Sequence, residues 1–257
     1  MRTAGIDLAA EPTRTGVAVI RWGTDRAVVE RVGLGNTDTD LLAVIQEADK
    51  AGLDCPLGWP DGFVDFISAH HSCAAMNRAT TFDRQWRRSL AYRMTDEVVR
   101  LSTGLIPLSV STDRIGLTAM RAAVLLDQCV EAGIPVQRSG KGRVVEVYPS
   151  ASLSVWGLPH RGYKGAKNRS SLTELVAGLL RQCPWLDLAA FRELIEHADD
   201  AFDAVIAALS ARAVALNRAT TPTPDQLETA QREGWIALPL CRPGDLVGDT
   251  VGASPPT

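Results

Sequence analysis

Short apolar runs separated by turn residues open the chain. They cover residues 3–9, 15–20 and 27–32, and Pro12 and Gly33 lie in the segments that bound them. Runs of this length between turn residues are typical of β-strands that pair in order along the chain. The pattern therefore predicts an antiparallel meander of three strands.

The pattern then changes to helical spacing. Residues 38–50 carry apolar side chains on one face and predict an amphipathic helix. A short run at 53–58, broken by Pro56, predicts a fourth strand. The same two patterns recur as a helix at 114–132 and a fifth strand at 143–148. Shorter helices are expected at 61–70, 95–102, 170–182 and 189–196.

The order of these elements predicts the fold class. Three antiparallel strands, a helix, a fourth strand, helices, a fifth strand and further helices are typical of an α/β fold, with a mixed five-stranded sheet flanked by helices. We expect one domain over residues 1–242, with a helical insertion at about 61–113. Residues 243–257 are rich in Gly, Pro, Ser and Thr, and we expect a disordered tail there.

An apolar helix with an acidic first turn is predicted at residues 199–216. Asp200 and Asp203 share one face of it, whereas Asp199 is turned about 100 degrees from Asp200. Capping and the helix dipole favour acidic residues at a helix N-terminus, which explains Asp199 and leaves Asp200 open. Asp203 lies beyond the cap in an apolar segment, where an unpaired charge is costly. The helix therefore indicates either a metal or catalytic site or a structural cap.

Two more aspartates are expected at strand ends. Asp7 closes the first run and Asp54 lies in the fourth. In α/β sheets, strand-end residues meet along one rim, where ligands bind. We therefore expect Asp7 and Asp54 to face the helix that bears Asp200 and Asp203. The structural alternatives are an ordinary strand-end turn for Asp7 and hydrogen bonds to nearby backbone N–H groups for Asp54.

Several short motifs together resemble those of a known family. They are residues 5–9 (GIDLA), 53–60 (LDCPLGWP), 92–96 (YRMTD), 145–149 (VEVYP), 163–165 (YKG) and 199–204 (DDAFDA). This set resembles domain of unknown function family 429, identified as predicted nucleases of the ribonuclease H-like superfamily. Residues 200–204 are also similar to the acidic helix of Holliday-junction resolvases. The resemblance extends to residues 233–239 and implies a sheet of three antiparallel and then two parallel strands.

The resemblance implies a metal-dependent nuclease. Phosphodiester hydrolysis needs stabilised charge on the phosphoryl group and an activated water, which two Mg²⁺ ions about 4 Å apart supply. Carboxylate oxygens are suitable ligands for Mg²⁺, or for Mn²⁺ in its place. By resemblance, Asp7 would bridge both ions, and Asp54 and Asp200 would each hold one. Asp203 would ligate or orient from the next turn, and Asp200 and Asp203 could exchange roles.

Three residues outside the four aspartates are further candidates. Glu146 lies in the predicted fifth strand and is a candidate catalytic acid near the same rim. Its structural alternative is pairing with Arg93 or Lys164. Because Arg93 and Lys164 lie within the motifs of the resemblance, we expect them to bind the substrate through its phosphate or leaving group.

Composition narrows the partners only slightly. A chain of 257 residues with 46% hydrophobic residues can bury one sizeable core. Its net charge of −3 gives the protein no overall electrostatic attraction to nucleic acid or membrane. A polyanion would therefore have to bind to a local basic patch.

Five cysteines without a CxxC pair favour reduced thiols in a cytoplasmic protein. No apolar run reaches a membrane span, and the N-terminus leads into a strand rather than a signal peptide. We expect nucleic acid or a nucleotide as partner, and no membrane.

Two other function classes remain open. An actin-like ATPase shares this core but needs a glycine-rich phosphate loop after the first-strand aspartate, where this chain has residues 8–12 (LAAEP). A noncatalytic protein that binds a nucleotide or anion is mildly favoured by the negative charge, whereas four retained acids argue against it. The sequence leaves open the substrate, whether RNA, DNA, junction or nucleotide, and the oligomeric state.

Overall fold

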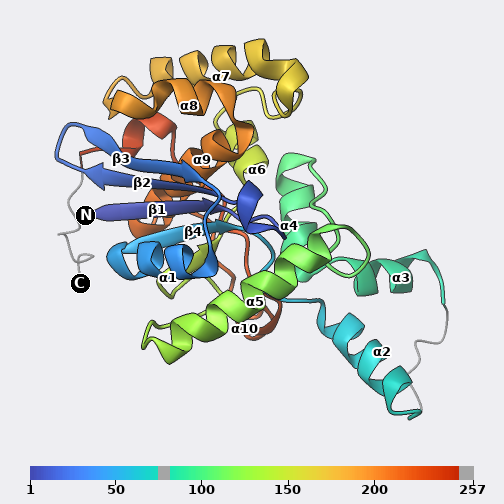
Figure 1. Cartoon of the computed structure of the whole chain (residues 1–257). Helices are drawn as coiled ribbons and strands as arrows, with labels where there is room; N and C mark the ends of the chain where they lie inside the picture. The colour runs from blue at the N-terminus through green and yellow to red at the C-terminus, as the bar shows by residue number, and fades with distance from the viewer. Residues whose placement is uncertain (75–81, 249–257) are drawn as a thin grey trace, which may run out of the picture.

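A mixed β-sheet forms the centre of the molecule in the computed structural model, which describes residues 1–74 and 82–248. Within those residues the sheet has six strands in the order β5-β4-β1-β2-β3-β6. Figure 1 labels β3, β2, β1 and β4, which lie side by side in that order. The strands are β1 (Arg2–Asp7), β2 (Gly16–Trp22), β3 (Ala27–Leu34), β4 (Lys50–Asp54), β5 (Val144–Glu146) and β6 (Leu186–Asp187). The first three pair antiparallel, and β4 and β5 continue the sheet parallel to β1.

This arrangement confirms the predicted α/β class and the predicted succession of three antiparallel and two parallel strands. The predicted number of strands was too low, because β6 adds a short parallel partner to β3. With only two residues, Leu186–Asp187, this strand is too short to produce a periodic pattern.

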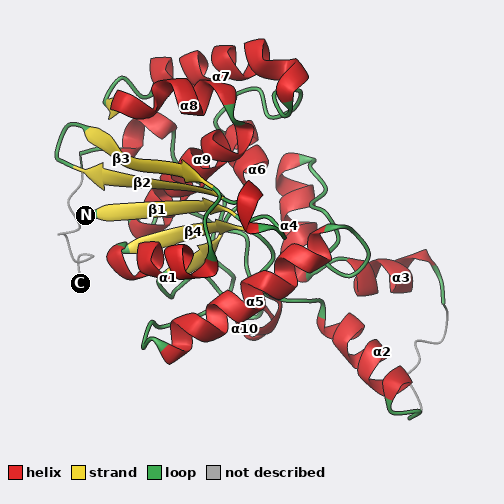
Figure 2. Cartoon of the chain, in the orientation of Figure 1, coloured by secondary structure: helices red, strands yellow, loops and turns green. Residues whose placement is uncertain are grey.

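Helices cover both faces of the sheet (Figure 2). They are α1 (Asp38–Glu47), α2 (Asp61–His71), α3 (Arg84–Ala91), α4 (Met94–Thr103), α5 (Ile115–Glu131), α6 (Pro149–Val155), α7 (Arg169–Gln182), α8 (Arg192–His197), α9 (Asp199–Ala215) and α10 (Leu227–Glu233). One core layer joins α1 and α5 to the sheet, and a second layer joins α6, α7, α8 and α9 to its other face. In the region of the predicted insertion, α2 and α3 project away from the sheet (Figure 1).

The boundary between α1 and β4 differs from the prediction. The helix begins as expected after Thr37, which forms a capping box with Asp40, but it ends at Glu47. Lys50 is already in β4, and its ammonium group is buried, where it donates hydrogen bonds to the carbonyl oxygens of Gly140 and Gly142. A lysine in a polar-looking segment gives no sign of a buried strand, because its partners come from a distant loop.

The C-terminal segment also differs from the prediction in the part that the structure describes. Pro243–Leu246 form a short 3-10 helix, and the side chain of Leu246 is fully buried. The Nε of Arg212 in α9 donates a 3.0 Å hydrogen bond to the carbonyl oxygen of Leu246. Residues 243–248 therefore do not match the expected disorder, and residues 249–257 lie outside the described residues.

Helix α9 lies directly on the sheet. It is buried on nearly all sides, as expected for a helix that is apolar around its circumference. An added Cβ at Gly5 would lie 1.9 Å from the carbonyl oxygen of Ala204, and one at Gly52 would lie 2.5 Å from that of Ala207. Because β1 and β4 offer only glycine at these neighbouring positions, the helix backbone contacts the strand backbones. This contact brings the first turns of α9 to the strand ends.

Substituting Gly5→Ala is expected to lower the free energy of unfolding by about 3 kcal/mol, since the new methyl group overlaps a backbone carbonyl that cannot move alone. Gly62→Ala in α2 is the matched control, because there the nearest heavy atom would lie 3.5 Å from the new Cβ, an ordinary contact. Urea unfolding of both variants measures the difference. Equal stability of the two variants would show that α9 does not need this close approach.

Among the described residues, no helix combines the length and apolar character that a membrane span requires.

Candidate metal centre

Asp7 and Asp54 lie side by side at one rim of the sheet. They are the last residues of β1 and β4 and are directly opposite each other in the parallel ladder. Adjacent parallel strands are about 4.8 Å apart, so the two carboxyl groups are neighbours by construction of the sheet. Both residues are half-buried.

Asp203 completes an acidic group from the opposite side. It lies in the second turn of α9, and its side chain is fully buried. Among the described residues, carboxylate oxygens of Asp7, Asp54 and Asp203 all lie within 4.8 Å of one another. The acidic group, defined as these three residues, thus joins two strands and one helix that are far apart in the sequence.

Asp200 lies next to this acidic group and is not one of its members. Its side chain is half-buried, and it lies close enough to Asp7 for each carboxyl group to influence the ionisation of the other. Burial, followed by the neighbouring charge of Asp199, raises the pKa of Asp200 above its usual value. Of the two aspartates predicted on one helix face, Asp203 therefore faces both strand ends, whereas Asp200 faces Asp7.

Two residues of the segment before α7 hold Asp203. The ammonium nitrogen of Lys164 lies 2.5 Å from Oδ2 of Asp203. The phenolic oxygen of Tyr163 donates a 2.8 Å hydrogen bond to Oδ1 of Asp203. Tyr163 also packs edge-on against Phe202, the preceding residue of α9. Sequence reasoning singled out Lys164 but missed Tyr163, although both belong to the same three-residue motif.

The electrostatics of the acidic group favour a bound positive charge. Burial raises the pKa of Asp54 to about 7, with further upward shifts from Asp203 and Glu146 and an opposing one from Lys164. Burial and the charges of Asp203 and Asp54 raise the pKa of Asp7 well above its usual range. One fully buried and two half-buried carboxyl groups with a single ammonium group retain an excess of negative charge when ionised.

The three carboxylates fit a small hard cation. Oxygen ligands lie 2.0–2.1 Å from Mg²⁺ in an octahedral shell, so ligands on opposite sides are about 4.2 Å apart. The carboxylate oxygens of the acidic group lie within 4.8 Å of one another, which is compatible with that span. A donor set made only of carboxylate oxygens suits Mg²⁺ or Mn²⁺ rather than a softer metal.

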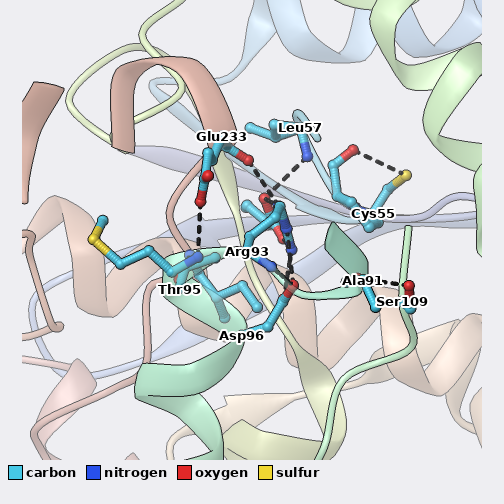
Figure 3. A network of polar contacts seen from close by, with 12 residues as sticks. Cys55, Leu57, Ala91, Arg93, Thr95, Asp96, Ser109 and Glu233 are labelled. Atoms are coloured by element: carbon cyan, nitrogen blue, oxygen red, sulfur yellow. Dashed lines mark hydrogen bonds and ion pairs between the residues drawn. The ribbon is translucent and has the colours of Figure 1, made fainter. Parts of the chain in front are cut away.

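The structure does not bring Arg93 and Glu146 into the acidic group. Arg93 is buried between α4 and β5, and Figure 3 shows its contacts with Asp96 and Glu233. Its Nη1 and Nη2 donate to Glu146 Oε2 and Oε1 at 2.8 and 2.6 Å. Its Nε and Nη2 donate to Asp96 at 3.2 and 2.9 Å, and Nη1 also donates to the carbonyl oxygen of Glu233 at 3.1 Å. Each of the five guanidinium N–H groups thus has a protein acceptor.

Glu146 is held as firmly as its partner. In addition to the two bonds from Arg93, its Oε2 accepts a 3.0 Å hydrogen bond from the backbone N–H of Leu57. Burial raises the pKa of Glu146, and the charge of Arg93 opposes that shift. The pairing with Arg93 is the structural alternative considered for Glu146.

Comparison with solved structures gives a similarity to T. thermophilus RuvC in complex with Holliday junction substrate. The identity is 13%, the alignment covers 80% of this chain and 92% of that chain, and the TM-score is 0.35. No curated protein matches the sequence.

A family model gives the assignment. The model described as "Protein of unknown function (DUF429)" matches residues 5–227, a range that includes the acidic group and Lys164. The chain therefore belongs to the DUF429 family, as its motifs indicated.

Proposed function

We propose that this protein is a metal-dependent nuclease that hydrolyses phosphodiester bonds. The observation that supports this most directly is the acidic group, in which Asp7, Asp54 and Asp203 converge from three elements within 4.8 Å. Like charges at this distance oppose one another in a buried site unless a cation lies between them. Carboxylates that share a cation are the arrangement that metal-assisted phosphoryl chemistry requires.

Each residue then has a defined role. Asp7, Asp54 and Asp203 would hold Mg²⁺ or Mn²⁺, and Asp200 beside Asp7 would complete the ligands of a second ion. The metal supplies charge stabilisation at the phosphoryl group and lowers the pKa of a bound water. Tyr163 fixes the orientation of Asp203. Lys164 is the flexible cation of the site, and its ammonium group would contact a non-bridging phosphate oxygen of the substrate.

We assign Arg93 and Glu146 a positioning role in place of the substrate contact and catalysis predicted from the sequence. Their ion pair joins α4 to β5, and Arg93 also binds the C-terminal residue of α10. The pair thereby fixes the strand that lies beside β4 and its terminal Asp54.

Cleavage assays test the proposed function. Labelled single-stranded, duplex and hybrid oligonucleotides are incubated with the protein in Mg²⁺, in Mn²⁺ and in EDTA. We expect shortened products only with a divalent metal. Binding of an oligonucleotide or nucleotide without turnover would support the noncatalytic alternative, and turnover in EDTA would contradict the metal-dependent reaction.

Mg²⁺ is expected to raise the unfolding temperature more at pH 8 than at pH 5.5. In the folded protein the pKa of Asp54 is about 7, above its usual 3.8. As the pH rises from 5.5 to 8, this carboxyl group ionises in the folded protein, in a site where burial disfavours its charge. The free energy of unfolding therefore falls over this pH range. A bound cation compensates that ionisation. Without metal, the unfolding temperature should therefore be lower at pH 8 than at pH 5.5. At pH 8, Mg²⁺ should raise it by roughly 5 °C.

Asp54→Asn provides the control for this pH dependence, because the amide cannot ionise. Its midpoint in EDTA should change less between the two pH values than that of the natural protein. Scanning calorimetry measures both proteins. An equal Mg²⁺ effect at pH 5.5 and pH 8 would argue against cation binding by the acidic group.

A further inference from the structure

A cavity of about 290 Å³ opens beside the acidic group. Asp7, Asp54 and Lys164 contribute to its polar side. Arg93 and Glu146, which pair with each other, also line it, and its apolar lining includes Leu8, Pro107, Leu108, Ile115 and the ring of Tyr148. The cavity therefore combines, in one small space, groups suited to a phosphate with bound metal and a wall suited to a flat apolar group.

The apolar wall depends on the segment between α4 and α5, residues 104–114. This segment is held in place by Ser109, whose hydroxyl donates a 2.6 Å hydrogen bond to the carbonyl oxygen of Ala91 at the end of α3. The carbonyl oxygen of Ser109 accepts a 2.9 Å hydrogen bond from the N–H of Asp113. The hydroxyl oxygen of Ser109 accepts a 3.2 Å hydrogen bond from the N–H of Thr112. Pro107 and Leu108 are thus presented by a tied turn.

Leu108 is the exposed part of this wall. Its side chain is 54% exposed, although it lines the cavity. Exposing a large apolar side chain beside a charged centre gives no folding benefit, because that surface is not removed from water. Contact with an apolar part of a ligand would bury it.

We propose that the cavity accepts one nucleobase unstacked from its neighbours, so that the substrate is single-stranded nucleic acid. This inference rests on the proposed nuclease function. The volume is at the lower end for a ligand site and leaves room for one nucleotide unit, whereas a base-paired segment keeps its bases inside the helical stack. Stacking of a base on an aromatic side chain is worth about 1–3 kcal/mol and depends little on base identity. Tyr148 can provide such a stacking contact and Leu108 an apolar one, while the adjacent phosphate meets Lys164.

Fluorescence anisotropy with one oligonucleotide, free and annealed to its complement, tests this proposal. Ca²⁺ replaces Mg²⁺ to allow binding to be measured apart from cleavage. We expect the single strand to bind about tenfold more tightly than the duplex, which corresponds to the contribution of one stacked base. Cleavage rates in Mg²⁺ should show the same preference.

Leu108→Glu is the informative variant. It should weaken single-strand binding about tenfold and raise KM with little change in kcat, because the contact is made equally in the ground state and the transition state. Leu117→Glu is the matched control, since Leu117 is 67% exposed on α5 and the change of charge is the same. Both variants change exposed residues, and thermal unfolding checks that each is folded.

The outcomes separate this inference from the proposed function. Metal-dependent cleavage with equal affinity for single strand and duplex, or equal behaviour of the two variants, would overturn the single-strand assignment and leave the nuclease proposal intact. Tight binding of a free mononucleotide without cleavage of any strand would assign the cavity to a nucleotide and overturn both. Failure to bind or cleave any oligonucleotide would likewise overturn both.

Discussion

Replacing Asp7 with asparagine should lower kcat/KM for oligonucleotide cleavage by about 10³-fold, without unfolding the protein. Asp7 belongs to the acidic group and also lies near Asp200, so its loss removes an anionic ligand from both proposed cation positions. Because burial and the charges of Asp203 and Asp54 raise the pKa of Asp7, the metal-free protein tolerates a neutral amide there. Initial cleavage rates and thermal unfolding in EDTA measure the two effects.

Asp187→Asn is a suitable control for this experiment. Asp187 also lies at the end of a strand of the sheet, but its carboxylate makes an exposed ion pair with Arg26 and accepts a 2.9 Å hydrogen bond from the backbone N–H of Ala189, which an asparagine side chain can accept as well. Exposed pairs contribute about 0–1 kcal/mol, so substitution of Asp187 should leave the cleavage rate unchanged.

Metal affinity gives a second test of Asp7. Asp7→Asn should bind Mn²⁺ more weakly, while its unfolding temperature in EDTA should stay equal or rise. Full activity in Asp7→Asn would refute the catalytic assignment.

Arg93→Ala is expected to cost about 3–5 kcal/mol of folding stability, because it leaves the buried carboxylates of Asp96 and Glu146 without their counter-ion. For a domain of this size the loss corresponds to a fall of roughly 10 °C in the unfolding midpoint. Arg93→Lys should recover only part of it, since an ammonium group cannot reproduce two fork-shaped contacts. Thermal unfolding of the three proteins gives the comparison.

Arg192→Ala provides the reference for an arginine whose ion pair is exposed. Arg192 pairs with Glu196 on the surface of α8, with 59% of its side chain exposed, and its loss should change stability by less than about 0.5 kcal/mol. The same variants decide the role of Arg93. If Arg93→Ala retained the natural unfolding midpoint and lost affinity for oligonucleotides, the substrate contact predicted from the sequence would replace the positioning role.

The rim of the sheet could be predicted from the sequence because its signals are local. Asp7 closes one short apolar run and Asp54 lies in another, and the carboxyl ends of parallel strands meet at one edge whatever the rest of the chain does. The helical spacing of Asp200 and Asp203 likewise predicts a shared face. Which of the two completes the acidic group could not be predicted, since that depends on how deeply α9 lies on the sheet.

The sequence offered the pairing of Arg93 with Glu146 only as an alternative, and the rest of the network around Arg93 could not be predicted. Its partners Glu146 and Glu233 are 53 and 140 residues away in the sequence, so no window of local periodicity contains them. A motif containing Arg93 indicates that the residue matters without indicating whether its guanidinium group faces solvent or is buried. Short elements such as α6 and α10, with seven residues each, are missed because two turns give too few positions for a periodic signal.

The glycines beneath α9 also provide a way to sort relatives of this protein. A homologue can keep every aspartate and still carry bulkier residues at the positions of Gly5 and Gly52, and its helix would then be displaced outward by the added side chains. Its carboxylates would be spread too widely to share one ion. Inspection of these two strand positions, rather than of the acids alone, should therefore separate family members that keep a functional centre from those that keep only its residues.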